Sequence, residues 1–300
     1  MKKVLITGGA GFIGSNLCKF LLKKKFDITV FDNLSSGRLS NIPKKIKFVK
    51  IDIRDKKLLK KNFKNFRYVV HLAAMPILQQ AIDNPKECID INLIGTQNIL
   101  EFCLKKNSKL IFASTCAVYP LDLKIKANEN SSGKLINPYS ISKFASENLI
   151  GFYAKQKKLK SVILRFFNVY GRNQNPNSQY SAVVAKFIKN SKRNLNLELY
   201  NNGEQKRDFI NVDDICKAIF RSFNHKNFDV FNVGTGHAVK IKDLAKIIVK
   251  YSKKGKIIKG KKTSFDAMYS CANINRIKKK MKFSPKISLK EGIKNLLNES

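Results

Sequence analysis

The stretch that decides the fold is TGGAGFIGSN, residues Thr7 to Asn16. It follows a short apolar run, KKVLI, and opens FIGSNLCKFLLKKK, in which apolar residues recur at helical spacing. Gly8, Gly11 and Gly14 therefore occupy a strand-to-helix turn. Glycines at this place permit a tight turn and a close approach of the backbone to a diphosphate, and the helix N-terminus offers free N–H groups. The stretch predicts a nucleotide-binding site.

A second predicted strand, DITVFD, ends at Asp32, eighteen residues after Gly14. A carboxylate at this point can accept hydrogen bonds from both ribose hydroxyls of an adenosine, and it repels a 2′-phosphate. We therefore expect NAD as the cofactor. Arg38, slightly further along the chain, is the one feature that keeps NADP as an alternative.

Short apolar runs alternate with longer amphipathic ones as far as Gly171, and this alternation predicts a doubly wound parallel α/β sheet. After Gly171 the chain becomes polar and turn-prone, in GRNQNPNSQYS, and its elements become shorter. We expect a dinucleotide-binding domain over residues 1–170, with returning segments near 208–235. A smaller substrate-binding lobe is expected over residues 171–207 and 236–300.

Composition excludes several other classes of protein. The 300 residues carry a net charge of +38, but the lysines run through the whole chain and form no single patch. Abundant Lys, Asn, Ile and Phe with no Trp are typical of a genome-wide bias towards A/T-rich codons. We expect nonspecific attraction to polyanions and no specific nucleic-acid surface. No apolar run reaches the roughly 20 residues of a membrane span. Six scattered cysteines without a C-x-x-C pair, and three distant histidines, indicate reduced thiols, no metal site and a cytoplasmic location.

A candidate catalytic pair lies in NPYSISKFASEN, where Tyr139 precedes Lys143 by four residues. Positions i and i+4 share one face of a helix. A free tyrosine has a pKa of about 10 and is a poor base at neutral pH, whereas a nearby ammonium favours the phenolate. We therefore expect Lys143 to lower the pKa of Tyr139. The pattern is short, and in so lysine-rich a chain it is also compatible with chance.

Several motifs follow one another in the order typical of one family and cover essentially the whole chain: TGGAGFIGSNL, FDNLSSG, DIRD, VVHLAA, NLIGTQNILEFC, FASTCAVYP, NPYSISKFASE, LRFFNVYG, QKRDFINVDDI, FNVGTG and SLKEGI. The chain resembles the extended short-chain dehydrogenase/reductase superfamily, in its nucleotide-sugar epimerase/dehydratase branch. It is most similar to UDP-glucose 4-epimerases and their N-acetylhexosamine relatives. This resemblance implies a Rossmann domain that holds NAD and a smaller C-terminal α/β lobe that binds a UDP-sugar.

The resemblance also implies roles for individual residues. The cofactor site would comprise Gly8, Gly11, Phe12, Ile13, Gly14, Asp32, Asn33, Asp52, Ile53, Leu72, Ala73, Ala74, Asn92, Ser114, Tyr139 and Lys143. The catalytic residues would be Tyr139, Lys143 and Thr115. The substrate would contact Thr115, Tyr139, Asn168, Tyr200, Arg207 and Ser270, with Arg207 on the diphosphate.

The implied reaction is epimerisation at C4 of a UDP-hexose through a transient 4-keto sugar. The 4,6-dehydratases of the branch usually carry an Asp-Glu pair where this chain has Cys116 and Ala117, so we expect no dehydration. Ser270 falls on the position that gates pocket size, and its small side chain favours an N-acetylhexosamine. Two places depart from the pattern of the family. Pro120 follows Val118 and Tyr119 where relatives usually have a glycine. Lys261 and Lys262 lie near the place where relatives usually have a second arginine for the diphosphate.

Alternatives remain at this point. A 4-keto-sugar reductase or another oxidoreductase or dehydratase of the branch is the second interpretation, and a noncatalytic nucleotide- or polyanion-binding protein is the third. The sequence leaves the sugar, the base and the pathway open. Relatives commonly dimerise through two helices, which would be residues 89–105 and 139–155 here, so we expect a homodimer. We interpret His71 as a packed histidine, and Asp213 with Asp214 as a helix N-cap and a first-turn acid.

Overall fold

The computed structural model describes residues 2–131, 133–176, 182–261 and 267–298. The chain divides into two compact units. Unit 1 comprises Met1–Val118, Lys134–Arg165 and Cys216–Phe231, and unit 2 comprises Tyr119–Gly133, Phe166–Ile215 and Asn232–Ser300.

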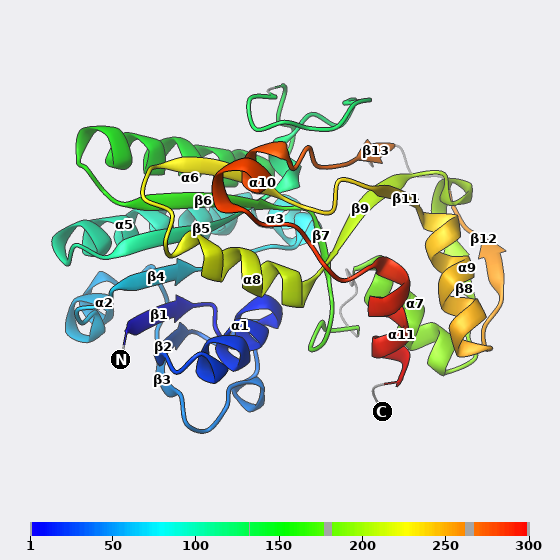
Figure 1. The fold of residues 1–300 in the computed structure, drawn as a ribbon, viewed down its shortest axis with the longest axis horizontal. Helices are drawn as coiled ribbons and strands as arrows, with labels where there is room; N and C mark the ends of the chain where they lie inside the picture. The colour runs from blue at the N-terminus through cyan, green and yellow to red at the C-terminus, as the bar shows by residue number, and fades with distance from the viewer. Residues whose placement is uncertain (1, 132, 177–181, 262–266, 299–300) are drawn as a thin grey trace. The chain divides into compact units, whose positions relative to one another are not determined.

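Unit 1 is built on a seven-stranded sheet (Figure 1). Its strands, in spatial order, are β10 (Asp229–Val233), β6 (Ser161–Phe166), β5 (Lys109–Thr115), β4 (Tyr68–His71), β1 (Lys3–Thr7), β2 (Asp27–Asp32) and β3 (Lys47–Lys50). The pairs β3–β2, β2–β1, β1–β4 and β4–β5 are parallel. The order reverses direction at β1 and β4, which is the place where doubly wound sheets bind nucleotides. The expected doubly wound α/β sheet is therefore confirmed.

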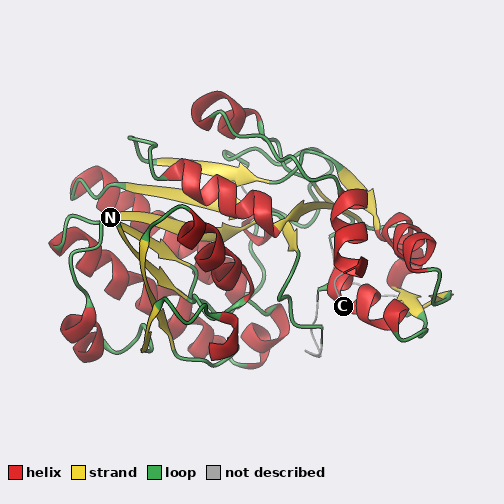
Figure 2. Ribbon diagram, turned by 60° about the horizontal axis from the view of Figure 1, so that its bottom comes forward, coloured by secondary structure: helices red, strands yellow, loops and turns green. Residues whose placement is uncertain are grey.

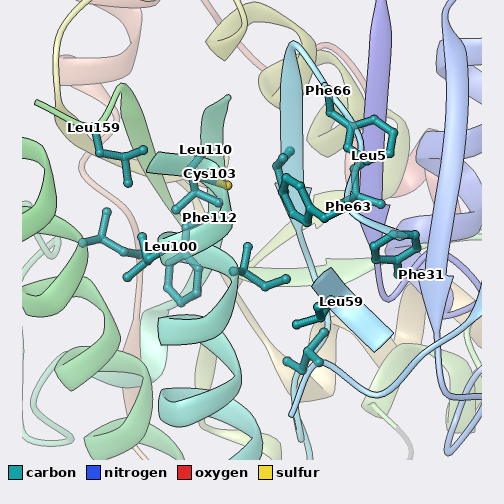
Figure 3. Close-up of a cluster of buried hydrophobic side chains, with 14 of the residues drawn as sticks. Leu5, Phe31, Leu59, Phe63, Phe66, Leu100, Cys103, Leu110, Phe112 and Leu159 are labelled. Atoms are coloured by element: carbon teal, nitrogen blue, oxygen red, sulfur yellow. The ribbon is translucent and has the colours of Figure 1, made fainter. Parts of the chain in front are cut away.

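Helices cover this sheet, as Figure 2 shows in red beside the yellow strands. They are α1 (Phe12–Lys23), α2 (Lys56–Asn62), α5 (Gly95–Lys105), α6 (Pro138–Gln156) and α8 (Val212–Ser222). Apolar residues of α2, α5 and α6 join Leu5, Phe31 and Phe112 of the strands in one buried cluster (Figure 3). Phe20 of α1 packs edge-on against Phe220 of α8.

The helix expected over residues 89–105 contains an interruption. It consists of α4 (Pro85–Ile89), one turn of π-helix called η2 (Asp90–Ile94), and α5, and it is preceded by α3 (Leu78–Asp83). The carbonyl of Asn92 accepts hydrogen bonds from the hydroxyls of Thr96 and Ser146 at 2.5 and 2.9 Å. Turns of π-helix inside α-helices occur frequently at functional sites.

Unit 2 holds two smaller sheets. In the first, β9 (Lys206–Asn211) lies between β11 (Ala238–Lys240) and β13 (Tyr269–Ser270) and also pairs with β7 (Asn168–Tyr170). The second pairs β12 (Ile257–Lys259) with β8 (Leu197–Leu199). The helices α7 (Val183–Lys192), α9 (Ile241–Ser252) and α11 (Leu289–Asn298) share a buried apolar cluster with β8 and β9, and α10 (Asn275–Met281) precedes α11.

The units differ from the expected domains at three places. Residues 119–133 and 166–170 belong to unit 2, and the segment that returns to unit 1 is 216–231. β7 is parallel to β9, which explains why residues 166–170 leave the first domain. Within the described residues, no helix combines the length and the apolar character needed to cross a bilayer.

Candidate functional site

The glycine-rich turn between β1 and α1 has little room for side chains. Gly8 has a φ of +72°, and a Cβ atom on Gly14 would lie 2.2 Å from the carbonyl oxygen of Gly8. Gly11 is the N-cap residue of α1, no side chain caps the helix, and its first turn, which contains Phe12, Ile13 and Gly14, has no acid. The first N–H groups of a helix lack intrahelical partners. The turn therefore fits the diphosphate of a dinucleotide.

Asp32 connects this turn to the loop after β2. Its Oδ2 accepts a hydrogen bond from the N–H of Ala10 at 2.9 Å, and its Oδ1 accepts one from the N–H of Leu34 at 2.8 Å. An ionised carboxylate has about four acceptor positions. Asp32 thus keeps acceptor capacity for two ribose hydroxyls while its backbone contacts hold it in place.

Asn33 and Asp52 lie next to one another, and we predicted neither their contact nor their other partners. The Asn33 amide donates to Asp52 Oδ2 at 3.1 Å. Arg54, which we did not predict, donates to both carboxylate oxygens of Asp52 at 2.9 and 2.7 Å. These hydrogen bonds, with that from the guanidinium largest, lower the pKa of Asp52 to about 2. Ile53 is buried, and a Cβ atom on Gly95 would lie 2.5 Å from its Cδ1.

The segment Leu72–Ala73–Ala74 follows β4 and lies against the glycine turn. A Cβ atom on Gly8 would lie 2.7 Å from the backbone nitrogen of Ala73, and Leu72 N–H donates to the carbonyl of Thr7 at 3.1 Å. Asn92 of η2 fixes the chain just beyond this segment, since its side chain bonds to both backbone groups of Met75. Asn92 also donates to the hydroxyl of Ser142 at 3.1 Å and so holds η2 against α6.

α6 presents the candidate catalytic pair. The helix begins with Pro138 after Asn137, whose side chain accepts from the N–H of Ser140 at 2.8 Å, a regular N-cap. This cap sets Tyr139 in the first turn and Lys143 one turn later. The structure brings Thr115, at the end of β5, close enough for its side chain to act on the pKa of Tyr139.

The expected lowering of the pKa of Tyr139 by Lys143 is wrong for this structure. Burial raises the pKa of Tyr139 to about 12, and the side chain of Thr115 opposes this rise only in part. Burial also lowers the pKa of Lys143 to about 7, against the field of Glu147. Burial therefore disfavours the ammonium of Lys143, which limits its ability to stabilise a phenolate.

Sequence reasoning missed the surroundings of Lys143. Its Nζ lies 4.0 Å from the ring centroid of Phe112 on β5. Glu147, one further turn along α6, is 5% exposed and accepts hydrogen bonds from the guanidinium of Arg165 on β6 at 2.6–3.2 Å. Ser114, which we expected near the nicotinamide, donates to the carboxylate of Glu147.

Four of the six predicted substrate residues belong to unit 2, whereas Thr115 and Tyr139 belong to unit 1. Register in the small sheet places Ser270 of β13 opposite Arg207 of β9, while Asn168 begins the neighbouring strand β7. The Asn168 amide donates to the carbonyl of Asp208 at 3.2 Å. Tyr200, in the short helical turn before β9, is 40% exposed. The Nζ of Lys186 lies over its ring, 5.7 Å from the ring centroid of Tyr200. Lys261 is described, whereas Lys262 lies outside the described residues.

Two lesser predictions had different outcomes. His71 is a packed histidine, as expected, with its ring nitrogens 2.6 and 3.0 Å from the hydroxyls of Thr7 and Thr96. The N-cap interpretation of Asp213 is wrong, because Asn211 accepts the hydrogen bond from the N–H of Asp213 at 2.9 Å. Asp214 does lie in the first turn of α8 and accepts from the backbone of Lys286 and Ile287 at 2.8 and 2.9 Å.

Comparisons with known proteins agree with this geometry. The model of the NAD dependent epimerase/dehydratase family matches residues 4–234. A protein of Methanocaldococcus jannaschii described as a putative UDP-glucose 4-epimerase is 36% identical over 299 residues, which cover 98% of this chain and 97% of that relative.

Two solved structures resemble the whole chain. The UDP-glucose 4-epimerase of Thermotoga maritima, solved with UDP-glucose, has a TM-score of 0.94 and 32% identity, covering 97% of this chain and 96% of its own. The UDP-N-acetylglucosamine 4-epimerase of Methanobrevibacter ruminantium, in complex with UDP-N-acetylmuramic acid, has a TM-score of 0.91 and 31% identity, covering 100% of this chain and 99% of its own.

Proposed function

Since the chain belongs to the NAD-dependent epimerase/dehydratase family, we propose that it is a UDP-hexose 4-epimerase. The observation that carries this proposal is the grouping of Thr115, Tyr139 and Lys143 in the unit that also holds the glycine turn and Asp32. The two solved structures named above are 4-epimerases of UDP-sugars, and the M. jannaschii relative is described as a putative one, although the family also includes dehydratases and decarboxylases.

The chain's own groups perform the proton transfer. Bound NAD would supply a hydride acceptor and a positive nicotinamide ring that favours the phenolate. Tyr139 accepts the proton of the sugar 4-hydroxyl, and Thr115, whose side chain acts on the pKa of Tyr139, relays it. When its amine is protonated, Lys143 stabilises the phenolate, and it also holds the ribose of the cofactor. The same groups return the proton when the 4-keto sugar is reduced on its other face.

The residues that follow Thr115 favour epimerisation over dehydration. Cys116 and Ala117 continue the chain directly after β5, in a half-buried turn, and neither supplies the acid and base that loss of the 6-hydroxyl requires. A keto-sugar reductase would need external NADH for each turnover, whereas an epimerase regenerates its cofactor.

A panel of UDP-, dTDP- and GDP-hexoses, incubated without added cofactor and followed by NMR, tests this function. We expect C4 epimers of UDP-sugars, with UDP-N-acetylglucosamine accepted because Ser270 leaves room for an N-acetyl group. Turnover of UDP-glucose alone would contradict the assignment of Ser270. A 4-keto-6-deoxy product, or a strict need for added NADH, would contradict epimerisation.

Asp32→Asn should weaken NAD binding and relax discrimination against NADP by about tenfold or more, since like charges in contact cost several kcal/mol. An amide offers one acceptor oxygen, while Ala10 and Leu34 donate to separate oxygens of Asp32. Calorimetric dissociation constants for NAD and NADP measure the change. Asp27→Asn, at the exposed start of β2, is the control. Unaltered discrimination in Asp32→Asn would count against the ribose contact.

We also propose that the chain acts as a homodimer in the cytoplasm. Ile141, Phe144 and Phe152 form an exposed apolar stripe along α6, and the adjacent α5 and η2 expose Leu104 and Ile94. Contiguous apolar surface of this kind typically marks an interface. All six cysteines are free thiols, as a reducing compartment requires. Light scattering should give twice the mass of one chain, and a monomer would contradict the dimer.

A further inference from the structure

Tyr139, Lys143 and Glu147 follow one another at intervals of four residues on α6 and therefore share one face of the helix. Lys143 and Glu147 are 4% and 5% exposed. A lysine and a glutamate are seldom buried this deeply unless each has a charged partner. The proposed mechanism uses Tyr139 and Lys143 and gives no role to Glu147.

Glu147 is held from two strands. The guanidinium of Arg165 on β6 donates from Nε to both carboxylate oxygens at 3.0 and 3.2 Å, and from Nη2 to Oε2 at 2.6 Å. From β5, the hydroxyl of Ser114 donates to Oε1. The planar fork of arginine gives such a pair a fixed geometry, so the carboxylate cannot turn away from its helix face.

The other titratable groups around Lys143 leave Glu147 as its counter-charge. His71 of β4 is neutral, because burial holds its pKa at about 3. Cys88 of α4 is a thiol, because burial raises its pKa above the ordinary value. Tyr139 is a phenol with a pKa of about 12. Among the described groups whose charge acts on Lys143, Glu147 is thus the anion, and it opposes the effect of burial on the ammonium.

We propose that Glu147 is a positioning residue that acts through Lys143: fixed by Arg165 and Ser114, its carboxylate keeps the Lys143 amine protonated. This inference rests on the catalytic role of Lys143 in the proposed function. The ammonium must be present for the phenolate of Tyr139 to form. The ion pair of Arg165 with Glu147, one turn beyond Lys143 on α6, therefore sets the pH range in which the enzyme is active.

The direction of the effect follows from charge. Removing one negative charge makes the loss of a proton easier for every neighbouring group. In Glu147→Gln the pKa of Lys143 should fall by about one unit or more, as expected for the loss of an opposite charge at close range. Both limbs of the pH profile of kcat should move to lower pH, because they report the coupled titration of Tyr139 and Lys143.

The direct test is an NMR titration of Lys143 in the NAD-bound protein labelled with [13Cε]lysine. The ring of Phe112, 4.0 Å from the Lys143 Nζ, should shift the ε-methylene signal away from those of other lysines, and Lys143→Arg assigns it. We expect a lowered pKa in Glu147→Gln and an unchanged one in Glu101→Gln, which removes an acid from an exposed pair with Lys56. An unchanged pKa of Lys143 in folded, NAD-bound Glu147→Gln would overturn the inference.

Two further outcomes keep the inference separate from the proposed function. If Glu147→Gln does not fold, the double variant Glu147→Gln/Arg165→Gln removes both charges and leaves neither unpaired. It should still lower the pKa of Lys143, and a value equal to that of the wild type would overturn the inference. A lowered pKa with an unmoved rate profile would confirm the charge coupling and contradict the catalytic role of Lys143.

Discussion

Replacing Tyr139 by phenylalanine is expected to lower kcat by about 10²- to 10⁴-fold, the usual contribution of a positioned acid or base. The change removes one oxygen and keeps the ring, so α6 and its N-cap at Asn137 should be undisturbed. NAD content, read from the absorbance of the denatured protein, should stay at the wild-type value. The rate is measured by NMR of the two C4 epimers.

Tyr153→Phe is the matched control for this variant. Tyr153 lies on the same helix, packs against the apolar cluster of unit 1, and also has a pKa raised by burial. Its loss of a hydroxyl should leave turnover unchanged. Full activity of Tyr139→Phe would remove Tyr139 from the chemistry, while equal losses in both variants would indicate a general effect on α6.

Lys143→Met should produce the second large loss, about 10²-fold or more near neutral pH. Methionine has a similar length but no charge, so no ammonium would oppose the rise that burial causes in the pKa of Tyr139. The phenolate is the active form, and its fraction below that pKa rises about tenfold for each pH unit. The rate of the variant should therefore climb steadily with pH, whereas that of the wild type should level off.

The control for Lys143→Met is a second buried lysine. Lys109 also has a pKa lowered by burial, to about 8, but its Nζ donates to the carbonyls of Ser222 and Phe223 at 2.7 and 3.2 Å. Lys109→Met should cost about 1–3 kcal/mol of stability through unpaired carbonyls and leave the rate profile in place. A flat pH response of Lys143→Met would contradict the role of its ammonium.

Local features are the ones whose place in the fold the sequence predicted. The glycine turn, Asp32 at the end of β2 and the Tyr139–Lys143 pair each depend on a few consecutive residues, and a strand or helix fixes their geometry. Thr115 could be added because the resemblance supplied its role. In the structure its side chain acts on the pKa of Tyr139.

The features that sequence did not predict depend on burial or on distant segments. Glu147, Arg165 and Ser114 meet because β5, β6 and α6 are neighbours, and nothing local in the chain indicates that Arg165 points at Glu147. The raised pKa of Tyr139 has the same origin, because desolvation outweighs the nearby charge that the helical spacing suggested. The domain boundary at residues 119–133 was missed because that segment pairs with residues far along the chain, as Ala127 does with Ala272.

In the proposed reaction, C4 of the sugar loses and regains the same hydride while Tyr139 moves a proton. A UDP-hexose deuterated at C4, incubated with the purified protein and no added cofactor, tests this most directly. We predict the C4 epimer with deuterium fully retained at C4, as observed by NMR. Washout of the deuterium into solvent, or no epimer at all, would contradict the claim.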